Sequence, residues 1–471
     1  MPVGPAPFTF VDLFAGIGGF HAALSALGGE CVYASEIDKQ AASVYEANWG
    51  HKPDGDITKA ANDDHVLVPA HDVLAAGFPC QPFSKSGFQR GMEETRGTLF
   101  WNIAKIVEVR RPSVVLLENV RNIAGPRHLH EWAVIIRTLR DFGYRVSEDA
   151  AVFSPHLLPP YLGGRPQVRD RVFIAASLVG DTANEDDLRA DPPVFRTGVD
   201  GWAANDWDLD AHLPLDQDHK VVRGHTYGLS PSERRWIDAW NDFVVSMWEA
   251  RHGERLPGFP IWVDEWCLTE DLHVPEDTPD WKADFLRKNA AFYTENKATL
   301  DAWLARWDGL DDFPPSRRKF EWQAQDTPRL WDAVMHLRPS GIRAKRATYL
   351  PALVAITQTS IVGSRERRIS PREAARLQGL PEWFTFGDQA DGPTYKQLGN
   401  GVNVGVVYHV MRSLVNRDKD VLKECAPDLV DAVLGADPNP DPVVEMLRPG
   451  TGKLLTRTRD GHRWTRRPRT A

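Results

Sequence analysis

The stretch FTFVDLFAGIGG at residues 8–19 decides the fold of this chain. Residues 8–14 are mostly apolar and predict a buried strand, the glycines at 16, 18 and 19 predict a tight turn, and the stretch from Phe20 to about Leu27 predicts a helix. A strand, a glycine turn and a helix begin a nucleotide-type binding site in α/β proteins, because glycines let backbone N–H groups approach a ligand closely. By itself such a turn fits a dinucleotide enzyme or a purely structural loop equally well, and the spacing of these glycines counts against NAD.

Two acidic residues follow where further ligand contacts are expected. Residues 30–34 predict a second strand that ends in Ser35 and Glu36, and an acidic residue there is placed to bind both hydroxyls of a ribose. Asp56, followed by Ile57, offers another carboxylate that is suited to the amino group of an adenine. The glycine turn together with Glu36 therefore favours a ligand that contains a nucleoside.

The stretch AGFPCQPFS at residues 76–84 places Cys80 directly after a proline, where a short apolar strand gives way to a loop. Sheets of α/β proteins place their chemistry at such points. A free thiol, with a pKa of about 8.5, is mostly protonated at neutral pH, so a nucleophilic Cys80 needs a positive charge nearby. Without such a charge, Cys80 is more simply explained as a small buried hydrophobic residue.

Charged residues at the ends of two further predicted strands are candidates for the charged surroundings of Cys80. Residues 113–117 predict a buried strand that ends in Glu118, which fits an acid catalyst or a helix cap equally well. Arg169 and Arg171 alternate at the start of a strand predicted at 172–176, so their side chains point the same way. Two cations beside a cysteine and a glutamate suit an anionic ligand, and the alternative is a solvated strand edge.

Length and composition limit the possibilities. A chain of 471 residues is too long for one compact core, so two or more domains are expected. The absence of an apolar run of about 18 residues and of a secretion signal predicts a cytoplasmic protein with no membrane association. The four cysteines are scattered, which argues against disulfides and against a metal site. Because the net charge is -9, any contact with nucleic acid must use local basic patches.

Six motifs, in this order, resemble those of the DNA (cytosine-5) methyltransferase family, of the prokaryotic restriction-modification or phage-defence type. The resemblance covers most of residues 8–178 and 365–415. The motifs are DLFAGIGG at 12–19, GFPCQ at 77–81, ENV at 118–120, QVRDR at 167–171, REAARLQGLP at 372–381 and YKQLGNGV at 395–402. One departure is the segment at 161–167, which is longer between its tyrosine and proline than the usual version of this family.

The resemblance implies an α/β fold with a Rossmann-like catalytic domain that depends on S-adenosylmethionine, and a large inserted target-recognition domain. It implies methyl transfer to C5 of a cytosine that is flipped out of a specific double-stranded DNA sequence. Cys80 would attack C6, Glu118 would act at N3, Arg171 would hold O2, and Arg169 would meet a phosphate or help keep the thiol ionised. The residues implied to bind the cofactor are Phe14, Gly16, Ile17, Gly18, Gly19, Glu36, Ile37, Asp56, Ile57, Pro79, Leu99 and Asn400.

The stretch from about 181 to 365 matches none of these motifs, and in this family it would hold the target-recognition domain. It begins acidic and carries most of the tryptophans, several at helical spacing, which predicts a partly helical domain whose tryptophans form a core. Basic residues gather near its end, and phosphate contact is their expected use. The candidates for DNA contact are Arg343, Lys345, Arg346, Arg365, Arg367 and Arg368, together with Ser84 and Ser86 in the loop after Cys80.

We expect a discontinuous catalytic domain at 1–180 and 395–430, a target-recognition domain and hinge at 181–394, and a proline-rich linker with a basic tail at 431–471. We also expect a monomer on DNA, with a restriction or defence nuclease as partner by resemblance alone. A transfer-RNA cytosine methyltransferase is an alternative, but that relative is compact and this insert is large. An inactive DNA-binding regulator would be expected to lack the thiol, the acid or the arginines. A zinc cytidine deaminase is excluded, because Phe83 stands where a second cysteine is required.

Overall fold

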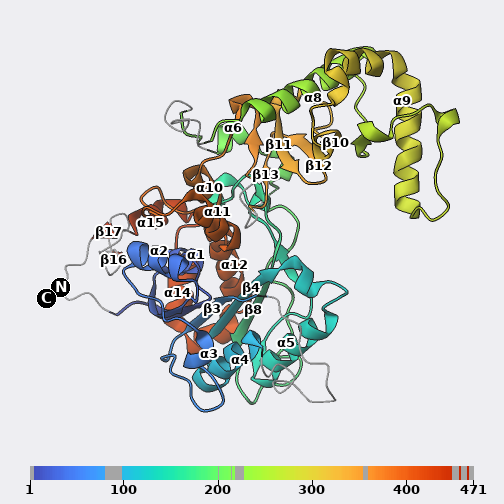
Figure 1. The fold of residues 1–471 in the computed structure, drawn as a ribbon. Coiled ribbons are helices and arrows are strands. Elements are labelled where there is room, and N and C mark those ends of the chain that lie inside the picture. Colours follow the sequence, from blue (N-terminus) through green and yellow to red (C-terminus); the bar gives the residue numbers. More distant parts are fainter. Residues whose placement is uncertain are drawn as a thin grey trace. The chain divides into compact units, whose positions relative to one another are not determined.

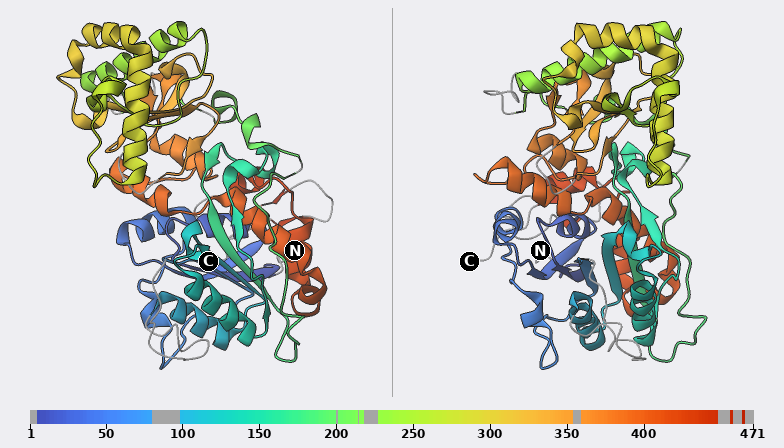
Figure 2. Two further views of the ribbon diagram at one scale, coloured as in Figure 1. Left: turned by 90° about the vertical axis from the view of Figure 1, so that its right-hand side faces the viewer. Right: turned by 45° about the vertical axis from the view of Figure 1, so that its right-hand side comes forward.

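The computed structural model describes residues 5–79, 98–199, 201–213, 215–217, 227–353 and 359–447, and the strands at 456–457 and 464–465. The chain divides into two compact units, drawn in Figures 1 and 2. The first unit comprises Met1–Trp207, Ala352–Ala355 and Ala374–Ala471, and the inserted unit comprises Asp208–Pro351 and Ile356–Glu373. The insert therefore begins at Asp208 rather than at residue 181, and the chain returns at Ala374 rather than at residue 395.

The first unit is built around a seven-stranded sheet with the order β2-β1-β3-β4-β8-β5, in which β6 also pairs with β8. Strands β2, β1, β3 and β4 run parallel, and β8 runs antiparallel to β4. The carboxyl ends of the parallel strands meet at one edge of the sheet, which is where α/β sheets bind their ligands. The strands of this sheet are β1 (Phe8–Leu13), β2 (Gly29–Ser35), β3 (Val73–Gly77), β4 (Val114–Val120), β5 (Tyr144–Arg145), β6 (Ala151–Phe153) and β8 (Arg171–Leu178), and the short strand β7 (Gln167–Val168) lies outside it.

Helices cover both faces of this sheet, as expected for parallel strands made of continuous apolar runs. Helices α4 (Leu99–Arg110) and α5 (Leu129–Asp141) pack on one face, where Ile103 and Ile135 join the same core as Val115 and Leu117 (Figure 1). Helix α1 (Gly19–Ala26) packs against α12 (Val404–Arg417). The α/β sheet predicted from the first motif is confirmed, and the end of the chain returns to it.

Residues 431–447, expected to be a linker, instead belong to helices of the first unit. Helix α14 (Pro427–Gly435) crosses the expected boundary, and α15 (Asp441–Met446) buries Val443 and Val444. Arg165 pairs with Asp441 at 2.8 Å, which ties α15 to the segment before β7. The remaining helices of this unit are α2 (Lys39–Trp49), α3 (Ile57–Ala60), α11 (Asp391–Asn400) and α13 (Lys419–Cys425), and α10 (Pro371–Leu377) spans the boundary.

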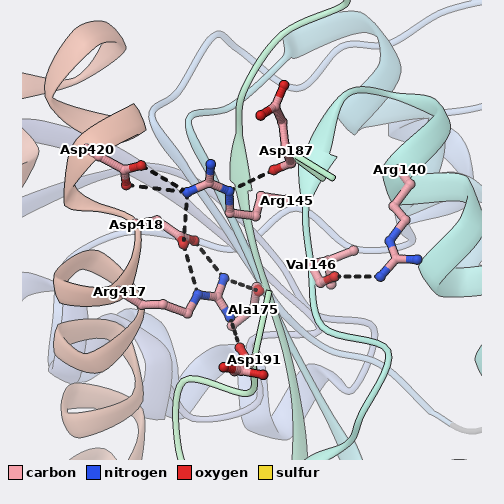
Figure 3. Close-up of polar contacts among 9 residues, drawn as sticks. All are labelled: Arg140, Arg145, Val146, Ala175, Asp187, Asp191, Arg417, Asp418 and Asp420. Carbon is pink, nitrogen blue, oxygen red and sulfur yellow. Dashed lines mark hydrogen bonds and ion pairs between the residues drawn. The ribbon is translucent and has the colours of Figure 1, made fainter. Parts of the chain in front are cut away.

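A buried polar network holds the junction of α12 and α13 against the sheet (Figure 3). Asp418 is 1% exposed; it accepts a hydrogen bond from Arg417 at 2.6 Å and lies 3.8 Å from Arg145, which also pairs with Asp420 at 3.2 Å. The two arginines further donate to the backbone carbonyls of Ala175, Asp187 and Asp191. Residues 181–191 are therefore fastened to the first unit, which explains why the insert begins later than the composition suggested.

The inserted unit combines a six-stranded sheet, with the order β15-β14-β11-β12-β10-β9, and two long helices. These are α8 (Pro231–Ala250) and α9 (Asp280–Arg306); a shorter helix, α6 (Leu209–His212), lies near its start. Trp240 and Trp303 are fully buried between the helices and the sheet, so the core role predicted for the tryptophans holds for these two. The strands of this sheet are β9 (Ile261–Trp262), β10 (Lys319–Gln323), β11 (Ala333–Arg338), β12 (Gly341–Arg346), β14 (Ile361–Val362) and β15 (Arg367–Arg368), and the short strand β13 (Leu350–Pro351) lies outside it.

Among the described residues, no helix is both long enough and apolar enough to cross a membrane.

Candidate active site

The loop after β1 has the backbone that a closely bound ligand requires. Phe14 (φ 56°), Gly16 (φ 55°) and Gly18 (φ 91°) all lie in the left-handed region. A Cβ on Gly18 would come 2.0 Å from Nε1 of Trp49, whereas a Cβ on Gly16 would meet nothing within 4 Å. Trp49 also donates to the carbonyl of Ile17 at 3.0 Å, so the loop is packed at Gly18 and open at Gly16. The open side is the place where a ligand can approach the backbone.

Glu36 and its neighbours hold this loop from the end of β2. The Glu36 carboxylate accepts hydrogen bonds from the N–H groups of Gly16 at 2.8 Å and Asp38 at 2.7 Å. The next residue, Ile37, is 71% exposed, so a large aliphatic side chain stands free beside the loop. An exposed apolar side chain next to an acidic group suits the flat ring and the hydroxyls of a nucleoside.

Asp56 and Ile57 are placed at the start of α3. Oδ1 of Asp56 caps this helix by accepting from the N–H of Thr58 at 3.0 Å and from its hydroxyl at 2.8 Å. Within the part of the chain that the structure describes, Oδ2 accepts no hydrogen bond and remains available. The side chain of Ile57 is buried in the core, so only its backbone can meet a ligand.

The last motif packs directly on the glycine loop. A Cβ on Gly19 would come within 2.7 Å of both Cγ2 and the carbonyl oxygen of Val402, so only glycine permits this contact. Asn400, two residues earlier, is exposed at the end of α11. Of the two cofactor candidates from other motifs, Pro79 is exposed after β3 and Leu99 is half-buried at the start of α4. The contact between Gly19 and Val402 was missed from the sequence, because nothing in either motif names its partner.

Glu118 lies at the carboxyl end of β4, opposite Gly77 of β3. Its Oε1 is 2.9 Å from Nε of Arg171, and a Cβ on Gly77 would be 3.5 Å from its Oε2. Burial raises the pKa of Glu118, although Arg171 and Arg169 act in the opposite direction. Because Glu118 lies within β4, it is not a helix cap, and the arrangement is that of a carboxylic acid able to act at an adjacent ring nitrogen.

Asn119 is a positioning residue that the sequence did not single out. Its Nδ2 donates to the carbonyl of Phe78 at 2.9 Å, two residues before Cys80, and its Oδ1 accepts from the N–H of Val120 at 2.8 Å. The only available signal was its place directly after Glu118. Cys80 itself, with Ser84 and Ser86, lies outside the described residues.

Arg169 does not reach a surface. It is 2% exposed, and its guanidinium donates to the carbonyls of Leu353 at 3.2 Å, Gly399 at 2.7 Å and Gly401 at 2.6 Å. Burial lowers the pKa of Arg169 to about 9. The expectation that it meets a phosphate is therefore wrong, because the group is enclosed and its N–H bonds are directed at the backbone.

Most of the basic candidates for DNA contact in the inserted unit have acidic neighbours. Arg343 pairs with Glu321 at 2.6 Å and Arg368 with Glu233 at 2.6 Å, while Arg346 and Arg365 lie 3.8 Å from Asp326 and 3.7 Å from Asp210. Lys345 is half-buried and forms no ion pair with an acidic residue among the described residues.

Arg367 is a correction to the predicted DNA contacts. Its side chain is 1% exposed and binds the fully buried Glu373, with Nη2 2.8 Å from Oε1 and Nη1 3.0 Å from Oε2. A buried bidentate pair of this kind cannot reach a phosphate, so Arg367 stabilises the inserted unit instead.

The fold and this site indicate a class of enzyme, and the comparison with known families identifies that class. Residues 8–416 match the family of C-5 cytosine-specific DNA methylases, so the chain belongs to that family. It is a DNA (cytosine-5) methyltransferase, and membership implies S-adenosylmethionine as the methyl donor.

The chain is similar to two curated relatives and to one solved structure. It is 48% identical to Type II methyltransferase M.AluI of Cellulosimicrobium cellulans, over 92% of this chain and 97% of that protein. It is 46% identical to Type II methyltransferase M.HhaI of Haemophilus parahaemolyticus, over 35% of this chain and 47% of that protein. The crystal structure of the S. pombe Dnmt2 methyltransferase covers 87% of this chain and is itself 98% covered, with 17% identity and a TM-score of 0.45. The match to M.AluI along nearly the whole chain does not favour the transfer-RNA alternative.

Proposed function

We propose that the chain methylates C5 of one cytosine within a specific double-stranded DNA sequence, through a covalent bond between Cys80 and C6 of a flipped-out base. The observation that carries the assignment of the active site is the pairing of Glu118 with Arg171 at the carboxyl end of β4, beside Gly77 of β3. Cys80 follows Gly77 by three residues in the sequence, which supports assigning it to the same site.

The chemistry requires electron density at C5, which is a poor nucleophile in cytosine itself. The Cys80 thiolate adds to C6 and Glu118 donates a proton or hydrogen bond at N3, which stabilises the electrons displaced into the ring. Arg171, whose Nε is held by Glu118 and whose Nη1 donates to the Asp170 carbonyl at 2.9 Å, supports O2 of the base. S-adenosylmethionine supplies an electrophilic methyl group. Loss of the C5 proton and release of Cys80 then restore the aromatic ring.

The cofactor pocket is assigned to the loop of β1 and its neighbours. Phe14, Gly16, Ile17, Gly18 and Gly19 line the loop, in which the N–H groups of Gly16 and Gly18 are bonded to Glu36 and to the carbonyl of Ala15 and hold the turn in shape. Glu36 binds the ribose hydroxyls, Ile37 covers the adenine, and Oδ2 of Asp56 accepts from the adenine amino group. The backbone of Ile57, with Pro79, Leu99 and Asn400, completes the pocket. The open space at Gly16 and the exposed side chain of Ile37 support this assignment.

We assign the DNA surface of the inserted unit to the outer face of β11 and β12. His336 lies opposite Arg343 in the register, and Arg338 and Lys345 share this face, while Met335 and Ile342 point into the core. Among the described residues, neither Arg338 nor Lys345 forms an ion pair, and Glu321, which pairs with Arg343, acts on both of them only at longer range. Cations held side by side are stabilised by an anionic ligand such as a phosphate backbone. Arg346, Arg365 and Arg368 remain candidates for phosphate contact, as do Ser84 and Ser86.

The biological role follows from the relatives. Type II methyltransferases are partners of restriction systems, so we infer that this enzyme protects host DNA from a nuclease of matching sequence specificity. It acts as a monomer on DNA and in the cytoplasm, where that DNA lies.

Methyl transfer to duplex DNA tests the proposal. Labelled S-adenosylmethionine is supplied with DNA of mixed sequence, with transfer RNA as a parallel acceptor, to the wild type, to Cys80→Ser and to Cys425→Ser. We expect label in DNA that falls by at least about a thousandfold in Cys80→Ser, because the nucleophile is lost. Cys425, an exposed thiol of α13, serves as the matched control and should retain full transfer.

Mapping the labelled cytosines then gives the recognised sequence. Label in RNA alone would contradict the DNA assignment, and undiminished transfer by Cys80→Ser would contradict the covalent mechanism.

A further inference from the structure

Arg169 makes an unusual set of contacts for a charged side chain. Its guanidinium is buried, and it donates to three backbone carbonyls, those of Leu353, Gly399 and Gly401. Its Nε has no hydrogen-bond partner among the residues that the structure describes. A charge buried in this way is stable only where its N–H groups are well paired, so the three carbonyls are held firmly in place.

Two of these carbonyls lie on either side of a proposed cofactor residue. Gly399 and Gly401 flank Asn400, and bonds of 2.7 Å and 2.6 Å to one nitrogen, Nη2, fix the peptide before Asn400 and the peptide between Gly401 and Val402. Val402 follows and presses on Gly19 of the glycine loop. The guanidinium therefore fixes the backbone conformation around Asn400. The same stretch of backbone packs against the loop after β1.

The third carbonyl is that of Leu353, in a short segment of the first unit. Leu353 belongs to Ala352–Ala355, four residues of the first unit that are flanked on both sides by residues of the inserted unit. Arg169, which directly precedes β8, therefore bonds both to the last motif and to the short segment that contains Leu353.

Arg165 provides a natural comparison four residues away. It also donates to backbone carbonyls, those of Gly164 and Arg376 at 2.9 Å, and pairs with Asp441 at 2.8 Å. Arg165 therefore holds α15 and the end of α10, but among the described contacts it forms no hydrogen bond with residues 399–401. Both arginines therefore donate to backbone carbonyls, but they stabilise different segments of the chain.

We propose that Arg169 is a positioning residue for the cofactor, which acts through the Gly399–Gly401 backbone and Asn400 rather than by contact with DNA or the target base. This inference rests on the proposed cofactor site. Lysine at this position keeps the charge but has no planar guanidinium, so it cannot reproduce the three bonds. If charge alone mattered, lysine would suffice; if the backbone is what Arg169 positions, lysine fails.

Binding of S-adenosylhomocysteine in the absence of DNA, measured by calorimetry, separates these roles. We expect Arg169→Lys to weaken binding about tenfold or more, since a lost charge-assisted bond is of that order, while Arg165→Lys stays within about twofold of the wild type. In steady-state turnover, Arg169→Lys should raise KM for S-adenosylmethionine more than it lowers kcat. Thermal unfolding checks that each variant is folded, and Arg169→Gln replaces the lysine form if that does not fold.

A double-mutant cycle with Asn400→Ala completes the test. If Arg169 acts through Asn400, the double variant should bind little worse than Asn400→Ala alone. Fully additive losses, wild-type affinity in Arg169→Lys, or an equal loss in Arg165→Lys would each overturn the proposal. A wild type that binds no S-adenosylhomocysteine would instead contradict the proposed function, so the two failures are distinguishable.

Discussion

Glu118 combines two conditions that oppose each other. Burial raises its pKa, so the neutral acid persists to higher pH than in a free side chain, while the Arg171 guanidinium 2.9 Å away favours the anion. A carboxyl group with these opposing influences can hold a proton in the resting enzyme and can still donate that proton during the reaction. This balance is a property of position, because glutamate in a solvated loop would be ionised at neutral pH.

The pH dependence of methyl transfer should report this group. Since the proton is needed at N3, the rate of single-turnover transfer should fall as pH rises through the raised pKa of Glu118. Glu118→Gln should lower the rate by about 10²- to 10⁴-fold and lose this descending limb, because the amide does not titrate. Stability follows the same sign: an acid with a raised folded pKa loses stability as pH rises from its unfolded pKa to its folded one, and Glu118→Gln should remove that loss. A descending limb that survives in Glu118→Gln would assign it to another residue.

The arginines illustrate what a sequence can and cannot give at this scale. The alternation of Arg169 and Arg171 suggested two cations acting together. Arg171 pairs with Glu118, but Arg169 is buried on backbone carbonyls that come from residues 184 to 232 positions away. Arg367 likewise sits in a basic run, and only its buried pairing with Glu373 removes it from the DNA contacts. Composition records charge, whereas exposure depends on long-range packing.

The glycine loop is the element whose behaviour the structure makes most specific. Gly16 and Gly18 both have positive φ, yet a Cβ at Gly18 would collide with Trp49 while a Cβ at Gly16 would enter open space. Gly18→Ala should therefore lower the midpoint of thermal unfolding, because Trp49 and its bond to Ile17 must shift. Gly16→Ala should lose only the roughly 1 kcal/mol of a left-handed L-residue, but it should abolish binding of S-adenosylhomocysteine. Equal stability losses, or intact binding in Gly16→Ala, would contradict this placement of the cofactor.

Elements with local signals were predictable, and those without them were not. The strand, glycine turn and helix at residues 8–27 follow from apolar runs and glycine spacing, and both are local properties. A linker was expected from residue 431 because Pro438, Pro440 and Pro442 indicate breaks in a helix. Pro440 and Pro442 in fact lie at the start of α15, where their missing N–H has no helical partner to lose.

At the scale of the whole molecule, the boundaries of the insert were displaced for a reason visible in Figure 3. The acidic stretch after residue 180 looked like the start of a new domain, but Arg145 and Arg417 bind carbonyls at Asp187 and Asp191 and keep it on the first unit. Family motifs located the catalytic unit without locating its edges, because the edges depend on pairings between residues more than 40 positions apart.

The DNA surface is a prediction at the same scale. Lys345 is half-buried beside Arg343 and Arg338, and burial with these two cations lowers its pKa. His336, on the same face, has its pKa lowered to about 4 by burial and by the three cations. Arg343 and Arg338 disfavour the charge of Lys345, and a bound polyanion would offset this repulsion, so Lys345 should contribute one phosphate contact.

Equilibrium binding to a fixed duplex over a range of salt concentrations measures this contribution. Lys345→Ala should weaken binding and reduce the slope of log K against log salt by about one, as for the loss of one phosphate contact. Lys288→Ala removes the same charge from α9, where Lys288 already pairs with Asp284 at 2.6 Å, and should leave the slope unchanged. An unchanged slope in Lys345→Ala would move the DNA surface away from β11 and β12. An equal fall in both variants would mean that net charge, and not this sheet face, governs the affinity.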